Sequence, residues 1–308
     1  MSVARLYARW LIFAALLTGG LAAPCHAGGA FRYCDPSAEL DASQQDTLFR
    51  FAAVIRSTLQ SSGATLALVS RAGYDLSRFG MRYSHAGISL RDNPSVPWSV
   101  RQLYFDCTER RPRIFDEGIA GFLVGAGDPS VGYFSVVFIP EAEAELARLA
   151  LDNRTALKLL GGTYSANAYA FGERYQNCNQ WVAEMLGLAW GGLGNLPPDM
   201  NLRAESQRWL RSAGYEPAKF TSANPIMIWA GATLPWLHSD DHPAQNLADG
   251  HYTVSMPHAI EAFARARVPG ARRVEFCHAN RRIVVREGWE PIAAGCVPGA
   301  GDQVIALD

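Results

Sequence analysis

The N-terminal segment places the strongest constraint on this 308-residue chain, because it decides the compartment in which the rest folds. Arg5 and Arg9 precede an apolar run over residues 10–23, and small residues lead to a cleavage position after Ala27. A basic start, an apolar middle and small residues before the cut are the parts of a secretory signal peptide. The run is shorter than the ~20 residues that span a bilayer, although a retained N-terminal anchor is the alternative. We therefore predict that residues 1–27 are a signal peptide and that the mature chain is periplasmic or secreted, with no stable membrane span.

An oxidising compartment makes the cysteine count informative. Removal of the signal peptide, which contains Cys25, leaves five cysteines: Cys34, Cys107, Cys178, Cys277 and Cys296. An odd number predicts two disulfides and one free thiol. Cys277 and Cys296 flank a predicted hairpin and are natural partners. Cys34 and Cys107 then pair by elimination, which leaves Cys178 free; the alternative is that Cys178 is a small, inert core residue.

The composition excludes some classes of partner. The chain is 49% hydrophobic and 19% charged, with a net charge of −1, which is typical of a globular protein. Without a basic excess or a polybasic run, we predict no nucleic-acid partner. Residues 237–242 contain two histidines and two aspartates, but their spacing fits no metal motif, so we predict no metal and no cofactor. The sequence leaves the oligomeric state open.

The hydrophobic pattern predicts an α+β fold with a central antiparallel sheet. Strands are expected at 65–70, 83–90, 98–105 and 133–139, and in a hairpin of 273–278 with 283–286. Helices are expected at 41–60 with Ser43 as N-cap, and at 141–151, 155–160, 178–188, 201–213 and 257–267. The helix at 178–188 is expected to be amphipathic. The second and third strands should be antiparallel neighbours. The main domain is predicted over residues 28–213, and residues 214–308 form a Pro- and Trp-rich extension on the same core.

Two short segments contain the candidate catalytic residues. In Tyr83-Ser84-His85-Ala86-Gly87-Ile88 a histidine lies in a strand, and in Gln176-Asn177-Cys178-Asn179-Gln180 a cysteine opens a helix. The unpaired N–H groups at a helix N-terminus favour the thiolate and can hold an oxyanion. We therefore predict Cys178 as nucleophile and His85 as base, with Asn177 as helix cap and Gln176 and Asn179 as amide donors.

A third polar side chain should orient the imidazole from the neighbouring strand. Gln102 is the predicted residue, and Ser99, Arg101 and Asp116 are the alternatives. Tyr83 and Asp116 are also predicted to line the site. Each segment alone is more often structural; together with a leftover thiol they favour a Cys–His site.

The segments "YSHAGI" and "NCNQWV" resemble the circularly permuted papain-like superfamily of the NlpC type, in which the histidine strand precedes the cysteine helix along the chain. The resemblance implies a papain-like core with Cys178, His85 and Gln102 at the functional positions, although that family often has Glu or His at the third. The mature chain also resembles a bacterial family known as domain of unknown function 2145. That resemblance rests on "SRAGYDLSRFGMRYSHAGISL", "FDEGIAGF", "YSANAYAFGERYQNCNQWVAEML" and "SMPHAIEAF".

These observations predict an exported cysteine hydrolase that cleaves an amide or ester. The superfamily resemblance implies a cell-envelope substrate, such as a peptidoglycan peptide or a lipid acyl group. The alternative is a non-catalytic scaffold or binding protein in which Cys178 is buried and inert.

Overall fold

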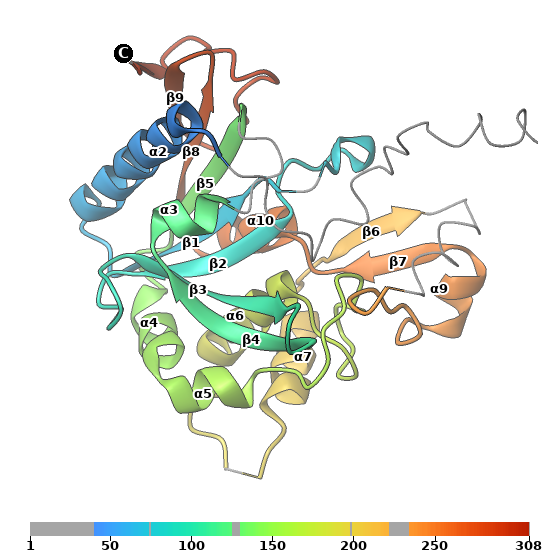
Figure 1. The fold of residues 1–308 in the computed structure, drawn as a ribbon. Helices are drawn as coiled ribbons and strands as arrows, with labels where there is room; N and C mark the ends of the chain where they lie inside the picture. The colour runs from blue at the N-terminus through green and yellow to red at the C-terminus, as the bar shows by residue number, and fades with distance from the viewer. Residues whose placement is uncertain (1–39, 74, 125–129, 198, 222–233, 308) are drawn as a thin grey trace, which may run out of the picture. The chain divides into compact units, whose positions relative to one another are not determined.

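The structure is a computed structural model that describes residues 40–307 apart from 74, 125–129, 198 and 222–233 (Figure 1). The predicted signal peptide, residues 1–27, and Cys34 of the predicted Cys34–Cys107 pair lie outside the described residues. Within the described part of the chain, no helix has the length and apolar character needed to cross a membrane.

An eight-stranded sheet forms the centre of the described residues, and its neighbouring strands are all antiparallel. The strand order is β10-β9-β8-β5-β1-β2-β3-β4. The strands are β1 Leu66–Arg71, β2 His85–Leu90, β3 Ser99–Asp106, β4 Arg111–Glu117, β5 Gly132–Phe138, β8 Arg272–Ala279, β9 Arg282–Glu287 and β10 Gln303–Ala306. A second, two-stranded sheet pairs β6 Ala218–Thr221 with β7 His251–Val254. The protein is therefore of mixed α+β class with a large antiparallel sheet, as predicted.

Helices cover both faces of the large sheet. The α-helices of the described residues are α2 Ala42–Ser61, α3 Ile119–Val124, α4 Glu143–Leu151, α5 Asn153–Lys158, α6 Cys178–Trp190, α7 Leu202–Ser212, α9 Ala244–Ala248 and α10 Pro257–Arg267, of which α9 lies beside β7 of the small sheet (Figure 1). On one face, α2 and α3 pack in a buried cluster with Val69 and Val100 of the sheet. Successive strand residues point to opposite faces. The alternate residues Leu68 and Ile88 are equally buried, and α4 and α6 contact β1 and β2.

The C-terminal strands extend the same sheet. β8 pairs with β5 along its length, and β9 and β10 follow outward from β8. The predicted disulfide between Cys277 and Cys296 is present and joins β8 to the chain after β9. Residues 272–306 therefore share the sheet that contains β1 and β2.

The structure corrects two local predictions and adds one strand. The N-cap of α2 is Asp41 and not Ser43, because Asp41 and Gln44 form a reciprocal capping box. Helix α6 was expected to be amphipathic, yet residues 178–189 are all buried, because the helix is enclosed by the sheet, α4, α7 and α10. Strand β4 was not predicted, because charged residues and Pro112 interrupt its apolar pattern; such residues are tolerated on an edge strand.

Candidate active site

Strands β2 and β3 pair over only part of their length. Their register ends at Ile88 and Arg101, whereas β3 continues to pair with β4 as far as Asp106 and Arg111. The beginning of β2 is therefore left without β3 as a partner. Buried backbone N–H and C=O groups must find other partners, so another part of the chain has to supply them here.

Helix α6 supplies those partners through Asn179. Its Oδ1 accepts from the backbone N–H of Ala86 at 2.9 Å, and its Nδ2 donates to the backbone C=O of Ser84 at 3.1 Å. The amide thus takes the place of a strand neighbour on both sides of His85. Because Cys178 directly precedes Asn179, this tether brings the backbone of the predicted nucleophile beside that of the predicted base.

The imidazole of His85 is held from the neighbouring strand, β3. Its Nε2 forms a short hydrogen bond with Oε1 of Gln102, and both side chains are buried. The ring centroid lies 5.5 Å from that of Phe122 on α3. Gln102 in turn donates from Nε2 to Oε2 of Glu117 at 2.5 Å. His85, Gln102 and Glu117 therefore form a row across β2, β3 and β4.

Cys178 is the first residue of α6. Asn177 caps the helix by accepting from the N–H of Gln180 at 2.6 Å. The backbone N–H groups of Cys178 and Asn179 and the hydroxyl of Tyr164 all interact with the thiol and favour its ionised form. Among the described cysteines, Cys178 carries the free thiol. Its residue exposure is 5%, so the thiol is enclosed.

Burial controls the charge of the pair. It raises the pKa of the Cys178 thiol to about 11, although the charge of Arg71 opposes this. Burial, followed by the charge of Arg71, lowers the pKa of His85 to about 3. Arg71 lies directly opposite His85 in the β1–β2 register, and its guanidinium lies 5.3 Å from the Phe122 ring centroid. At neutral pH this structure therefore holds a neutral thiol and a neutral imidazole.

Other predicted site residues have structural surroundings. Gln176 is fully buried and bonds to Gly161, Leu159 and Glu184. The hydroxyl of Tyr83 forms a short hydrogen bond with Glu275 of β8. Asp116 forms a bidentate ion pair with Arg101, at 2.6 and 2.9 Å. Arg101 and Asp116, two of the predicted alternatives to Gln102, are therefore bonded to each other.

Residues 238–242, which contain the His and Asp cluster, hold the loop that leads to Cys178. Ser165 exchanges two hydrogen bonds with the backbone of His238, and Asp241 accepts from the N–H of Tyr169. Within the described residues, no three His, Cys, Asp or Glu side chains gather as metal ligands would.

Three residues around the site were not predicted from sequence: Arg71, Glu117 and Tyr164. Arg71 ends an apolar strand, where polar residues are common, and Tyr164 lies in a loop without a periodic pattern. Glu117 carried a stronger signal, because β3 and β4 form a hairpin and Glu117 is opposite Val100, two residues from Gln102. That signal requires knowing that β4 is a strand.

The described chain is thus an α+β protein in which a free thiol opens a buried helix beside a histidine strand. The model of the family described as "Uncharacterized protein conserved in bacteria (DUF2145)" matches residues 58–264, and the chain belongs to this family. No curated protein and no solved structure matches the chain.

Proposed function

We propose that this protein is a cysteine hydrolase that cleaves an amide or ester bond outside the cytoplasm. The observation that carries the proposal is the Asn179 tether, which bonds to the backbone on both sides of His85 from the residue next to Cys178. A helix-opening cysteine beside a histidine with an oriented ring is the arrangement that nucleophilic acyl transfer needs.

The proposed reaction begins with the thiol of Cys178 and the imidazole of His85 both neutral. Because Nε2 of His85 is engaged by Gln102, Nδ1 is the nitrogen that can take a proton. As sulfur bonds to the acyl carbon, the thiol proton passes to Nδ1, and the carbonyl oxygen becomes an oxyanion near the N–H groups that open α6. The imidazolium then protonates the leaving amine or alcohol as its bond to carbon breaks. Water, deprotonated by His85, releases the acid from the thioester and restores the thiol.

The permuted papain-like resemblance adds a substrate class. In this proposal β2 and α6 are the histidine strand and cysteine helix of such a core, with Gln102 in the third position. The predicted export signal limits the substrate to groups outside the cytoplasmic membrane. A peptidoglycan peptide or a lipid acyl group has the required amide or ester.

A specific observation favours the second candidate, a non-catalytic scaffold. Cys178 is 5% exposed and its thiol pKa is raised to about 11 by burial. A catalytic Cys178 therefore requires that substrate displace part of its cover, of which Tyr164 is one member. A scaffold requires no such movement.

Alkylation by iodoacetamide at near-neutral pH, followed by mass spectrometry, separates the two candidates. If His85 activates the thiol, Cys178 should react at least ~10-fold faster in the wild-type protein than in His85→Gln, because a positioned base contributes 10²–10⁴-fold. His251→Gln changes an exposed histidine on β7 and is the matched control. Equal rates in wild type and His85→Gln, both below that of the unfolded chain, would establish an inert core cysteine.

Substrate class needs a second measurement. Purified mature protein is incubated with isolated peptidoglycan and, separately, with acyl-ester lipids, with Cys178→Ala as the control. New amino termini that depend on Cys178 identify a peptidase, and released fatty acid identifies an esterase. Product formation that persists in Cys178→Ala would contradict the assigned nucleophile.

A further inference from the structure

We propose that Glu117 is a positioning residue that fixes the tautomer of His85 through the amide of Gln102. The catalytic consequence rests on the proposed function, but the tautomer itself does not. The proposal is that the proton stays on Nε2 and the lone pair on Nδ1, so that the nitrogen not engaged by Gln102 is the basic one.

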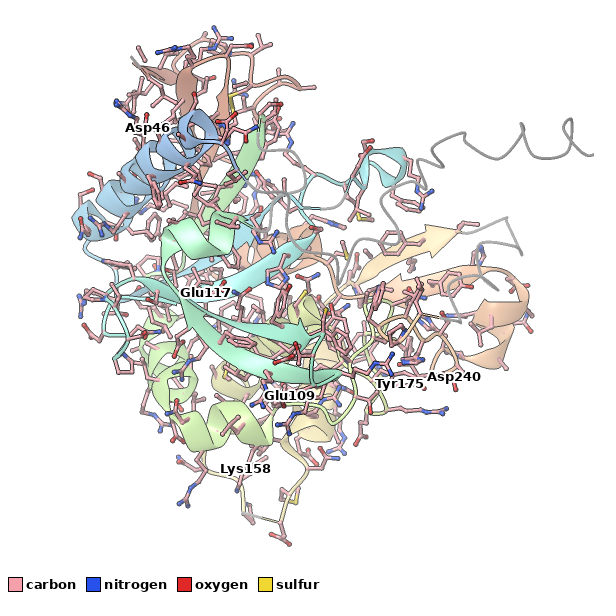
Figure 2. All side chains as sticks on the ribbon, in the orientation of Figure 1. Asp46, Glu109, Glu117, Lys158, Tyr175 and Asp240 are labelled. Carbon is pink, nitrogen blue, oxygen red and sulfur yellow. A yellow bond between two sulfur atoms is a disulfide. The ribbon has the colours of Figure 1, made fainter. Side chains whose placement is uncertain are left out.

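The register places the three side chains on one face of the sheet. Glu117 lies opposite Val100, and Gln102 lies opposite Phe115 in the same antiparallel pair. Since residues two apart share a face, Gln102 and Glu117 are diagonal neighbours. Glu117, labelled in Figure 2, is the last residue of β4, just before α3. The side chain of Phe122 from this helix lies against His85.

The donors and acceptors in this row allow one arrangement. Oε2 of Glu117 accepts a hydrogen bond from Nε2 of Gln102, so Glu117 faces the NH₂ end of the amide. A reversed amide would set its carbonyl oxygen against the carboxylate. With the NH₂ end held by Glu117, Oε1 faces His85, and a carbonyl oxygen only accepts. Nε2 of His85 must therefore donate, which leaves Nδ1 without a proton in the neutral ring.

Burial makes the arrangement costly to reverse. Gln102 is 2% exposed and His85 is 7% exposed, so reorientation would leave buried polar atoms without partners. Gly87 keeps β3 close: a Cβ there would lie 2.4 Å from Cγ1 of Val100 and 3.6 Å from Cβ of Gln102. The carboxylate of Glu117 thus determines, through the amide of Gln102, which ring nitrogen of His85 carries the proton. Substitution of Glu117 by Gln should remove this control, because a glutamine can either donate or accept.

Nitrogen-15 NMR of the ¹⁵N-histidine-labelled protein at neutral pH tests the proposal. The His85 ring is neutral there, since its pKa is lowered to about 3 by burial. In wild type we expect a protonated-type signal for Nε2 and an unprotonated-type signal for Nδ1. In Glu117→Gln both signals should shift toward intermediate values as the second tautomer becomes populated. Glu109→Gln on the same β3–β4 hairpin removes an exposed carboxylate and should leave the spectrum unchanged.

Two results would overturn the proposal: an Nδ1–H tautomer in wild type, or an unchanged His85 spectrum in folded Glu117→Gln. The wild-type measurement stands even if Glu117→Gln does not fold. Failure of the proposed function is distinguishable, because the tautomer can respond to Glu117 in a protein that hydrolyses nothing. If the protein is active, its rate should fall in Glu117→Gln and recover in part in Glu117→Asp, which keeps the acceptor.

Discussion

Gly87 lies two residues after His85 on β2, on the same face of the sheet, and it carries no Cβ at a point where β3 comes close. A Cβ at this position would meet Val100 Cγ1 at 2.4 Å. The absence of a side chain therefore permits the approach that places Gln102 against His85.

Gly87→Ala should destabilise the protein by about 1–3 kcal/mol, because Val100 and β3 must shift to admit the methyl group. Urea unfolding followed by tryptophan fluorescence measures the change. Gly162→Ala is the control, since a Cβ at Gly162 meets nothing within 4 Å. Equal unfolding free energies for the two variants would contradict close packing at Gly87.

His85 should also make the protein less stable in acid. Its pKa is lowered by burial from 6.5 to about 3 in the folded state. Between these values the unfolded chain binds the extra proton, so stability is lost as the pH falls through this window. In His85→Gln this contribution is absent, and the loss of stability between about pH 4 and 6.5 should be smaller by up to about 1.4 kcal/mol per pH unit. Parallel stability–pH curves for the two proteins would show that His85 titrates normally.

At the scale of elements, the main feature is the separation of β2 from β3 and the use of α6 in its place. Strand pairing ends at Ile88 and Arg101, and the Asn179 amide then bonds to the edge of β2 that β3 leaves unpaired. The same helix begins with Cys178, so the contact between α6 and β2 lies at the candidate site. A buried helix N-terminus with an asparagine bonded to a strand is a rigid support for functional side chains.

Asn179→Ala should cost about 2–4 kcal/mol of unfolding free energy, because it removes the side-chain partner of the buried N–H of Ala86 and of the partly buried C=O of Ser84. Chemical denaturation measures this loss. Asn201→Ala removes the exposed N-cap of α7 and should cost only about 1 kcal/mol. If Asn179→Ala costs no more than this control, the tether does not support the β2 edge.

At the scale of the whole described molecule, one sheet joins segments that are distant in sequence. Strands β1 and β5 lie between the β2–β3–β4 part and the β8–β9–β10 part. The Cys277–Cys296 disulfide closes a loop with a sequence separation of 19 at the C-terminal part. Loss of this crosslink should therefore weaken the sheet at β8, which is separated from β2 by β5 and β1.

Replacing both Cys277 and Cys296 with Ser should lower the unfolding free energy by about 3 kcal/mol, mainly because the unfolded chain regains the freedom of the closed loop. Thermal melting of the double variant and the wild type measures the difference. The His85 NMR signals should stay unchanged in the variant, and altered signals would show that the two ends of the sheet are coupled.

Much of the fold could be predicted because its elements have strong local patterns. The stripe of α2 gave the helix within one residue, and β2 and β3 were correctly paired through their short turn. Strand β4 was missed because an edge strand needs no continuous apolar pattern, as Pro112 and its charged neighbours illustrate. The enclosure of α6 was missed because only the surrounding elements decide that a helix is buried on all sides.

The sequence by itself determined the class of fold, the Cys277–Cys296 pair and the residue types that the candidate site contains. These follow from local periodicity, turn residues and the placement of cysteines around a hairpin. Only the tertiary structure decided that Gln102 bonds to His85, that Glu117 supports Gln102, and that Cys178 is enclosed. These properties depend on strand register and on which surfaces exclude water. Both are set by contacts between residues far apart in the chain, which no local pattern encodes.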